Sequence, residues 1–258
     1  MEHKARKRFG QNFLHDRHVI DRIVRAIHPK AGEHLVEIGP GLGALTLPLL
    51  QSVGRLEVVE LDRDLIPKLE QQCAGQGELI IHSADALKFD FCSLAAGGKL
   101  RLAGNLPYNI STPLIFHLLE QAHCIDDMHF MLQKEVVERL AAKPDTSDYG
   151  RLSVMVQYRC KVEQLFIVPP GAFTPAPKVD SAIVRLEPHA APPVDVDAAV
   201  LEKLVAQAFG QRRKTLRNTL KGLLDAEAIE AAGIDPQRRA ETLSLQEFAA
   251  LARRVAGS

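Results

Sequence analysis

The chain has 258 residues, of which 46% are hydrophobic and 25% charged, and its 32 basic side chains balance its 32 acidic ones. This composition is ordinary for a soluble globular protein, and it argues against a uniformly basic nucleic-acid binder, so any cationic surface must come from local clustering of charge. No apolar run is long enough to cross a bilayer, and the short basic N-terminus is not followed by the apolar stretch of a secretory signal. We therefore expect a cytoplasmic protein.

Apolar runs and helical patterns alternate through the first half of the chain. A helix is expected at residues 19–27, where apolar residues recur at helical spacing. Strands follow at residues 34–38, 56–61, 79–82, 100–103 and 128–132, with helices at 44–51, 65–73 and 113–122 between them. This alternation predicts an α/β fold, with parallel βαβ units in a doubly wound sheet.

The pattern changes in the second half of the chain. Less helix separates the strands expected at residues 153–160, 162–168 and 181–186, so the sheet is predicted to end in antiparallel edge strands. Residues 190–198 are predicted to be a linker, and residues 200–255 to be helical throughout, with breaks near 222, 233–236 and 242–244. We expect a large α/β domain at residues 1–189 and a small helical domain at residues 199–258.

The cysteines are Cys73, Cys92, Cys124 and Cys160, and they show no paired spacing. This pattern predicts neither a disulfide framework nor a zinc site, and it favours reduced, buried side chains in a reducing compartment. The ten histidines form no recognisable metal-binding motif. No metal site is expected.

A glycine-rich turn follows the first expected strand, in the sequence VEIGPGLG at residues 36–43. Gly39 and Gly41 let the backbone approach a ligand closely, and the helix that follows offers free N–H groups. Glu60 ends the next strand, nineteen residues after Gly41, where a carboxylate can hold both ribose hydroxyls of a nucleoside cofactor. A tight turn without a ligand is the alternative explanation of these glycines.

The third strand leads into Asp85 and Ala86. An acid at this place can accept a hydrogen bond from an adenine amino group of the cofactor, although a helix cap or a plain surface aspartate is an equal alternative for Asp85 taken alone. The carboxyl edge of an open α/β sheet is where such folds bind ligands. The glycine turn, Glu60 and Asp85 stand at or just after the ends of three successive strands, and together they predict a cofactor site at this edge.

The motif after the fourth strand is Asn105-Leu106-Pro107-Tyr108. The nitrogen of an aromatic amine such as adenine N6 is a poor nucleophile because its lone pair is delocalised into the ring. Two acceptors, the side-chain carbonyl of Asn105 and the backbone carbonyl of Leu106, can hold both amino hydrogens and free that lone pair, while Pro107 fixes the turn. Tyr108 offers a face on which a flipped base can stack. A β-turn with a packed tyrosine is the alternative.

These motifs, in this order, resemble those of adenine-N6 methyltransferases, and two further segments resemble the ribosomal RNA adenine dimethylases in particular. The sequence RFGQNFL at residues 8–14 is similar to the N-terminal motif that folds over the cofactor in that family. The sequence FTPAPKVDS at residues 173–181 is similar to its second substrate-side loop. The resemblance covers essentially the whole chain and is strongest to the family's small-subunit branch.

The resemblance implies a Rossmann-like class I methyltransferase domain with a mostly parallel seven-stranded sheet, and S-adenosylmethionine as cofactor. It implies dimethylation of two adjacent adenines in a hairpin loop near the 3′ end of 16S rRNA, within a precursor 30S subunit, by a protein we expect to be monomeric. Phe173 would stack on the target base opposite Tyr108. The residues implied to line the cofactor site are Asn12, Leu14, Gly39, Gly41, Glu60, Asp85, Ala86 and Asn105.

A basic segment at residues 211–221 carries no acid. Apolar residues on a second side of the same segment predict an amphipathic helix. Its basic side chains are candidate contacts for rRNA phosphates, with a solvated helix face as the alternative. They are Arg212, Arg213, Lys214, Arg217 and Lys221.

Three other functions fit parts of the pattern. A nicotinamide-dependent dehydrogenase shares the glycine turn and Glu60 but leaves the motif at residues 105–108 unexplained. A methyltransferase that acts on large-subunit rRNA and confers antibiotic resistance shares the fold, although residues 173–181 and the long C-terminal part favour the small-subunit enzyme. An assembly or transcription factor could keep the fold without the reaction.

Overall fold

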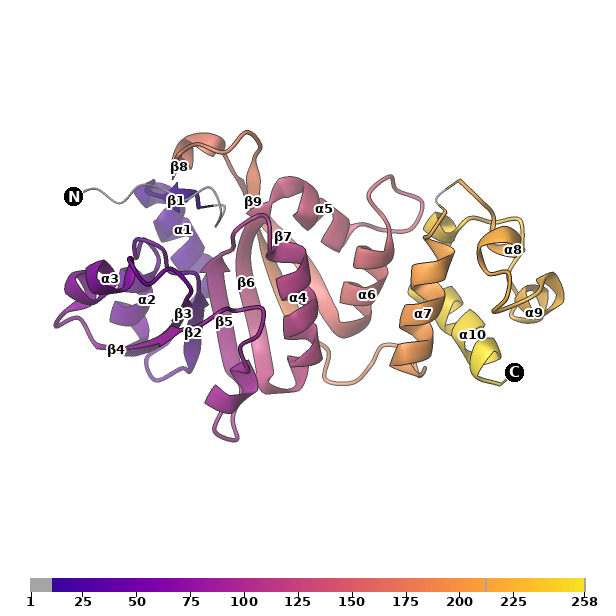
Figure 1. Cartoon of the computed structure of the whole chain (residues 1–258), viewed down its shortest axis with the longest axis horizontal. Helices are drawn as coiled ribbons and strands as arrows, with labels where there is room; N and C mark the ends of the chain where they lie inside the picture. Colours follow the sequence, from indigo (N-terminus) through magenta and orange to yellow (C-terminus); the bar gives the residue numbers. More distant parts are fainter. Residues whose placement is uncertain (1–10, 212, 258) are drawn as a thin grey trace. The chain divides into compact units, whose positions relative to one another are not determined.

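Figure 1 shows a computed structural model of the chain. The chain divides into two compact units. The structure describes residues 11–211 and 213–257. The first unit comprises Met1–Val137 and Lys161–Pro188, and the second comprises Glu138–Cys160 and His189–Ser258. The second unit thus takes in residues 138–160, which precede the expected linker by some distance in the sequence.

The first unit is built on a seven-stranded sheet with strand order β4-β3-β2-β5-β6-β9-β7. All pairs from β4 to β6 are parallel, and β9 pairs antiparallel with β6. The predicted mostly parallel sheet with an antiparallel end is confirmed. The strands are β2 (Leu35–Ile38), β3 (Arg55–Glu60), β4 (Glu78–Ser83), β5 (Leu100–Asn105), β6 (Ile125–Gln133), β7 (Cys160–Val168) and β9 (Ser181–Pro188).

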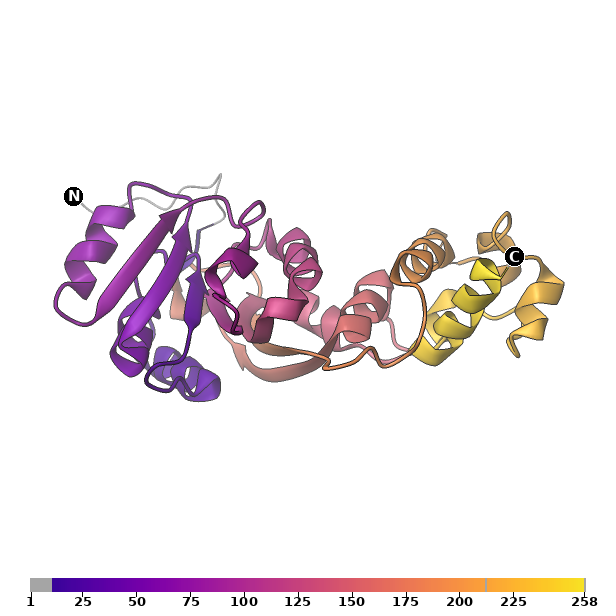
Figure 2. The same cartoon turned by 90° about the horizontal axis from the view of Figure 1, so that it is seen from below.

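Helices connect the parallel strands, as the alternation predicted. One further helix, α1, precedes the sheet: it begins after Asp16, which accepts hydrogen bonds from two backbone N–H groups, and it ends at Ile27, followed by His28 in the left-handed conformation just before a proline. Figures 1 and 2 show the helices beside the strands that they connect. The helical segments are α1 (Arg17–Ile27), α2 (Thr46–Val53), α3 (Ile66–Cys73), η2 (Phe91–Leu94), α4 (Ser111–Glu120), η3 (Ala122–Cys124) and η4 (Pro170–Ala172).

One core cluster joins α1, α2 and α3 to side chains from six strands of the sheet. Ile27 of α1 and Leu49 of α2 are almost wholly buried, as is Val58 of β3. Burying a side chain of this size contributes on the order of 2 kcal/mol. The cluster holds the strands in register and so fixes where their carboxyl ends meet.

A short two-stranded sheet ties the N-terminal segment to the loop before β9. Its strands are β1 (Phe13–Leu14) and β8 (Phe173–Thr174), paired antiparallel. His15 also donates a backbone hydrogen bond to Ala172 O. Two segments that lie 160 residues apart in the sequence are thereby brought together.

The second unit is helical. Its last helix begins with a capping box, in which Ser244 and Glu247 exchange hydrogen bonds. The helix α5 (Lys134–Ala141) continues from the first unit into it. The other helices are α6 (Arg151–Arg159), α7 (Ala198–Ala208), α8 (Leu216–Thr219), α9 (Ala226–Ala231), η5 (Ala240–Thr242) and α10 (Leu245–Ala256). None of the helices described could span a membrane.

The strand predicted at residues 153–160 is wrong, because residues 151–159 form α6. The hydroxyl of Ser153 accepts a hydrogen bond from Gly150 N and so caps the helix start. Gln157 donates to the carbonyl oxygens of Leu140, in the last turn of α5, and Ala142, just after it. Most of α6 is buried, so its sequence lacks the one-sided apolar pattern that identifies an amphipathic helix.

The prediction of four reduced cysteines is wrong as well. Cys92 and Cys124 form a disulfide, whereas Cys73 and Cys160 are free and buried. The bonded pair lies in η2 and η3, two short helical segments that meet only in the folded chain. No spacing rule on the sequence can detect such a pair.

Candidate cofactor and target-amine site

A cavity of about 320 Å³ opens at the carboxyl edge of the parallel strands. It is lined by the segments that follow β2, β3, β4 and β5, and by residues 11–14 of the N-terminal segment. This is the edge at which open α/β sheets bind ligands. The structure therefore brings the predicted cofactor and target-amine motifs to one site.

The glycine turn after β2 depends on conformations that only glycine adopts easily. Gly39 and Gly41 have φ angles of +68° and +58°. A Cβ on Gly41 would lie 3.3 Å from the ring of Phe13, which packs over the turn. The backbone of this turn thus lines the cavity without side chains in the way.

Glu60 lies at the end of β3 with its carboxylate at the cavity wall. Its two oxygens accept hydrogen bonds from Asp62 N at 2.7 Å and Gly41 N at 3.2 Å, which orient the group. Burial raises the pKa of Glu60, although these backbone donors offset part of the effect. A fixed, buried carboxylate with lone pairs to spare suits two vicinal ribose hydroxyls.

Glu37 is a site residue that the sequence analysis missed. It lies in the middle of β2, is 1% exposed and lines the cavity, and no described residue donates a hydrogen bond to its Oε2. Burial raises the pKa of Glu37 to about 8; the nearby Thr46 hydroxyl offsets part of this effect, and the charge on Glu60 adds to it. The sequence could have revealed this residue, because an acid stands inside an otherwise apolar strand and a buried carboxyl needs a partner. A cationic ligand group, such as an amino-acid ammonium, would supply one.

Asp85 and Ala86 follow β4 and also line the cavity. The carboxylate of Asp85 accepts a hydrogen bond from Leu87 N at 3.0 Å, which closes a turn; residues 86–88 are not helical, so Asp85 is not the helix cap that the sequence offered as an alternative. The bond fixes one oxygen of the half-buried carboxylate at the cavity wall. This turn bond and a ligand contact are therefore compatible.

Asn105 ends β5, and its amide is oriented by the N-terminal segment. Its Nδ2 donates to Asn12 O at 3.1 Å, so the side-chain carbonyl is the part of the amide able to accept from a ligand. Leu106 donates its backbone N–H to Met131 O. Both residues line the cavity, together with Pro107 and Tyr108.

Tyr108 is held by a contact that the sequence did not predict. Its hydroxyl lies 2.6 Å from the hydroxyl of Ser181, at the start of β9. Burial raises the pKa of Tyr108, and the hydrogen bond to Ser181 offsets part of the effect. The ring is half-buried at the cavity wall, so it keeps a surface on which a base could stack.

The N-terminal segment covers the cavity as the resemblance implied for Asn12 and Leu14, both of which line it. Gln11 donates to Asp62 at 3.1 Å and so links the segment to the end of β3. The first three residues of the predicted motif, at positions 8–10, lie outside the described residues.

Phe173 is not among the cavity residues. It is 3% exposed and belongs to the core cluster, because β8 pairs with β1 and places the ring among apolar side chains. The structure therefore does not bring Phe173 opposite Tyr108. A stacking role for this ring would require it to leave the core.

The basic segment is not the continuous helix that the sequence predicted. Among the described residues of this segment, Leu216–Thr219 alone are helical, and Leu216 N and Arg217 N at the start of this helix donate to the carbonyls of Arg238 and Pro236. Lys214, Arg217 and Lys221 are exposed.

Arg213 is exposed as well, but it lines a second cavity, of about 370 Å³, together with Asp145 and Glu241. Acids from elsewhere in the chain thus approach a segment that carries none of its own. Arg212 lies outside the described residues.

Comparison with known proteins decides the family. The sequence model described as ribosomal RNA adenine dimethylase matches residues 2–256. The chain belongs to the ribosomal RNA adenine dimethylase family. It is 64% identical over 257 residues to ribosomal RNA small subunit methyltransferase A of Pseudomonas aeruginosa, covering 99% of this chain and 96% of the relative. It is 65% identical to the protein of the same name from Pseudomonas fluorescens, covering 99% and 94%.

Solved structures agree with this placement in the family. A dimethyladenosine transferase from Plasmodium falciparum has a TM-score of 0.81 and 27% identity, covering 93% of this chain and 95% of that one. The 23S rRNA methyltransferase ErmE has a TM-score of 0.75 and 26% identity, covering 95% and 100%. The chain therefore has the class I methyltransferase fold and uses S-adenosylmethionine as its cofactor. The described cavity fits that cofactor, since Glu37, Glu60 and Asp85 match its ammonium, ribose and adenine groups in kind.

Proposed function

We propose that this protein transfers methyl groups from S-adenosylmethionine to the N6 nitrogen of adenines in small-subunit rRNA, and that it dimethylates two adjacent adenines in a hairpin loop near the 3′ end of 16S rRNA. The observation that carries the proposal is the orientation of Asn105, whose amide NH2 is engaged by Asn12 O so that its carbonyl can accept from a target amine. Relatives with 64% and 65% identity carry the name of a small-subunit enzyme.

The proposed chemistry overcomes the poor nucleophilicity of the adenine N6 nitrogen. Conjugation spreads the N6 lone pair into the ring. If the side-chain carbonyl of Asn105 and the backbone carbonyl of Leu106 accept hydrogen bonds from the two N–H groups, they would favour a pyramidal nitrogen with a localised lone pair. Bound S-adenosylmethionine supplies a methyl carbon activated by its sulfonium. The amine becomes acidic only after the new N–C bond forms, so no strong base is needed to remove its proton beforehand.

The remaining residues would hold the reactants. Glu60 would accept from the ribose hydroxyls, Asp85 from the adenine amine of the cofactor, and Glu37 would receive the ammonium group. Tyr108, held by Ser181, would stack on the flipped target adenine. Positioning of this kind can account for a large share of a rate enhancement, because it replaces a bimolecular encounter by a fixed geometry.

Contacts with rRNA are proposed for the exposed basic side chains near α8. Lys214, Arg217 and Lys221 would bind phosphates, whereas Arg213 shares its cavity with two acids and should contribute less. We propose that the protein acts as a monomer in the cytoplasm, on a precursor 30S subunit, and so takes part in ribosome biogenesis. The small helical unit would then provide RNA affinity separate from the chemistry.

The strongest alternative is methylation of large-subunit rRNA, since the solved 23S rRNA methyltransferase has the same fold. Primer extension on both rRNAs from a deletion strain distinguishes the targets, because a dimethylated adenine stops the polymerase. We expect the stops near the 3′ end of 16S rRNA to disappear on deletion and to return with the wild-type gene. Loss of a stop in 23S rRNA instead would refute the proposed target.

A further inference from the structure

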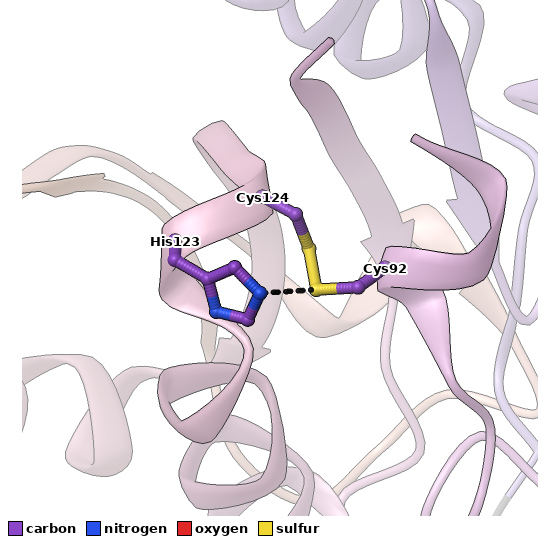
Figure 3. A group of neighbouring side chains, drawn as sticks. All are labelled: Cys92, His123 and Cys124. Carbon is purple, nitrogen blue, oxygen red and sulfur yellow. Dashed lines mark hydrogen bonds between the residues drawn. A yellow bond between two sulfur atoms is a disulfide. The ribbon is translucent and has the colours of Figure 1, made fainter. Parts of the chain in front are cut away.

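Cys92, His123 and Cys124 form a cluster outside the cofactor cavity (Figure 3). The ligand atoms of the three side chains lie within 4.8 Å of one another. Cys92 is half-buried, His123 is exposed and Cys124 is buried. The proposed methyl transfer does not use these groups, and solvent can reach Cys92 and His123.

A backbone carbonyl oxygen lies beside both sulfurs. The carbonyl oxygen of Gln121 lies 3.6 Å from the sulfur of Cys92 and 3.1 Å from that of Cys124. Disulfide sulfurs carry no proton, so these contacts become hydrogen bonds only when the pair is reduced. Reduction would thus allow the Cys124 thiol to donate to Gln121 O, and the Cys92 thiol to do so while it keeps its proton.

His123 makes the two sulfurs unequal. Its Nε2 lies 3.4 Å from the sulfur of Cys92, and Figure 3 shows the ring directed at that atom. A protonated imidazole stabilises a neighbouring thiolate, which is the form of cysteine that attacks disulfides. Cys92, which is both nearer to the histidine and more exposed, should therefore react first with a reagent from solution.

The two segments keep their places without the disulfide. The side-chain oxygen of Gln121 accepts from Phe91 N at 2.7 Å and from Cys92 N at 3.2 Å, and its nitrogen donates to Phe89 O. These three bonds already hold η2 against the end of α4. The thiols of the reduced protein would stay close enough to bond again.

We propose that Cys92 and Cys124 are a reversible thiol–disulfide modification site for low-molecular-weight disulfides such as oxidised glutathione. The Cys92 thiolate attacks one sulfur of the reagent, so that a Cys92–sulfur bond forms, the bond between the reagent's sulfurs breaks, and one thiolate leaves and takes up a proton. Cys124, after losing its proton to solvent, attacks the Cys92 sulfur and displaces the second thiolate. The two cysteines lose two electrons, and the reagent gains them as two free thiols.

The test uses the full-length protein, reduced with a phosphine, desalted and exposed to oxidised glutathione before alkylation and peptide mass spectrometry. The wild type should form the Cys92–Cys124 disulfide, and Cys124→Ser should stop at a mixed disulfide of glutathione on Cys92. Cys92→Ser should leave Cys124 unmodified. The buried Cys73 and Cys160 are internal controls and should not react.

Two further variants test the role of the histidine. In the Cys124→Ser background, His123→Asn should slow formation of the mixed disulfide about tenfold at neutral pH, whereas His18→Asn, a change at another exposed histidine, should not. Trapping on Cys124 rather than Cys92, or equal rates for the two histidine variants, would overturn the proposal. So would stoichiometric zinc in the purified protein that is lost in Cys92→Ser, because the cluster would then be a metal site.

Discussion

Gly104 of β5 lies against the backbone of β2 with no room for a side chain. A Cβ at this position would lie 2.3 Å from Ile38 O, and neither backbone can move away without disturbing the pairing of the two strands. Gly104→Ala should therefore lower the free energy of unfolding by about 1–3 kcal/mol. Urea denaturation measures the change. Gly171→Ala is the matched control, since a Cβ there meets nothing within 4 Å, and equal midpoints for the two variants would contradict the steric argument.

The buried carboxyl of Glu37 predicts a pH dependence of stability. Its pKa is about 8 in the folded protein and near 4.5 when exposed, so between these values the folded state holds a proton that the unfolded state has lost. Stability contributed by this group is complete below pH 4.5 and is lost as the pH rises towards 8, by at most about 1.4 kcal/mol per pH unit.

The glutamine of Glu37→Gln cannot ionise, so this variant should lose the contribution of Glu37 to the change of the free energy of unfolding with pH. Urea denaturation of the cofactor-free protein at pH 5.5, 6.5 and 7.5, values chosen inside the roughly 4.5–8 window, measures it. The difference in stability between variant and wild type should shift in favour of the variant as the pH rises. A difference that stays constant over this range would mean that Glu37 is charged in the folded protein.

Among the elements, the segment around α8 has no acid of its own in the sequence, but in the fold two acids from distant positions lie beside its Arg213. Arg217→Glu should weaken rRNA binding and lower its salt dependence, with little effect on cofactor affinity, because one phosphate contact would be lost. Filter binding over a series of salt concentrations measures both. Lys161→Glu, an exposed lysine of β7, is the control for total charge. If both variants show the same salt slope, the segment is only a solvated surface.

The last helix, α10, depends on its capping box. The hydroxyl of Ser244 accepts from Glu247 N at 3.2 Å, and Glu247 accepts from Ser244 N at 2.8 Å. Ser244→Ala should cost about 1 kcal/mol of stability, measured by urea denaturation, while Ser244→Thr should cost less because it keeps the hydroxyl. Equal losses would show that the hydroxyl does not cap the helix.

For the whole molecule, the sheet and its ligand edge could be predicted because the deciding signals are local. Apolar runs of strand length alternate with helical patterns, and Glu60, Asp85 and Asn105 each stand at or just after the end of a strand. Parallel strands bring those ends to one edge, so the convergence of these residues on one cavity followed from topology. The order of these motifs also sufficed to indicate the family.

What could not be predicted depends on contacts between distant parts of the chain. Cys92 and Cys124 meet because η2 and η3 pack together, and Phe173 enters the core because β8 pairs with β1. The helix α6 is too thoroughly buried to show an amphipathic pattern. In each case tertiary packing decides, and the sequence nearby carries no sign of the partner.

The central claim is that Asn105 helps to hold a target adenine for methylation in small-subunit rRNA. Immature small subunits incubated with the protein and isotope-labelled S-adenosylmethionine, then digested to nucleosides for mass spectrometry, test it directly. We predict labelled N6,N6-dimethyladenosine in 16S rRNA with the wild type, and none with Asn105→Ala, which should still bind the RNA. Full labelling by Asn105→Ala, or label on another nucleoside, would contradict the account.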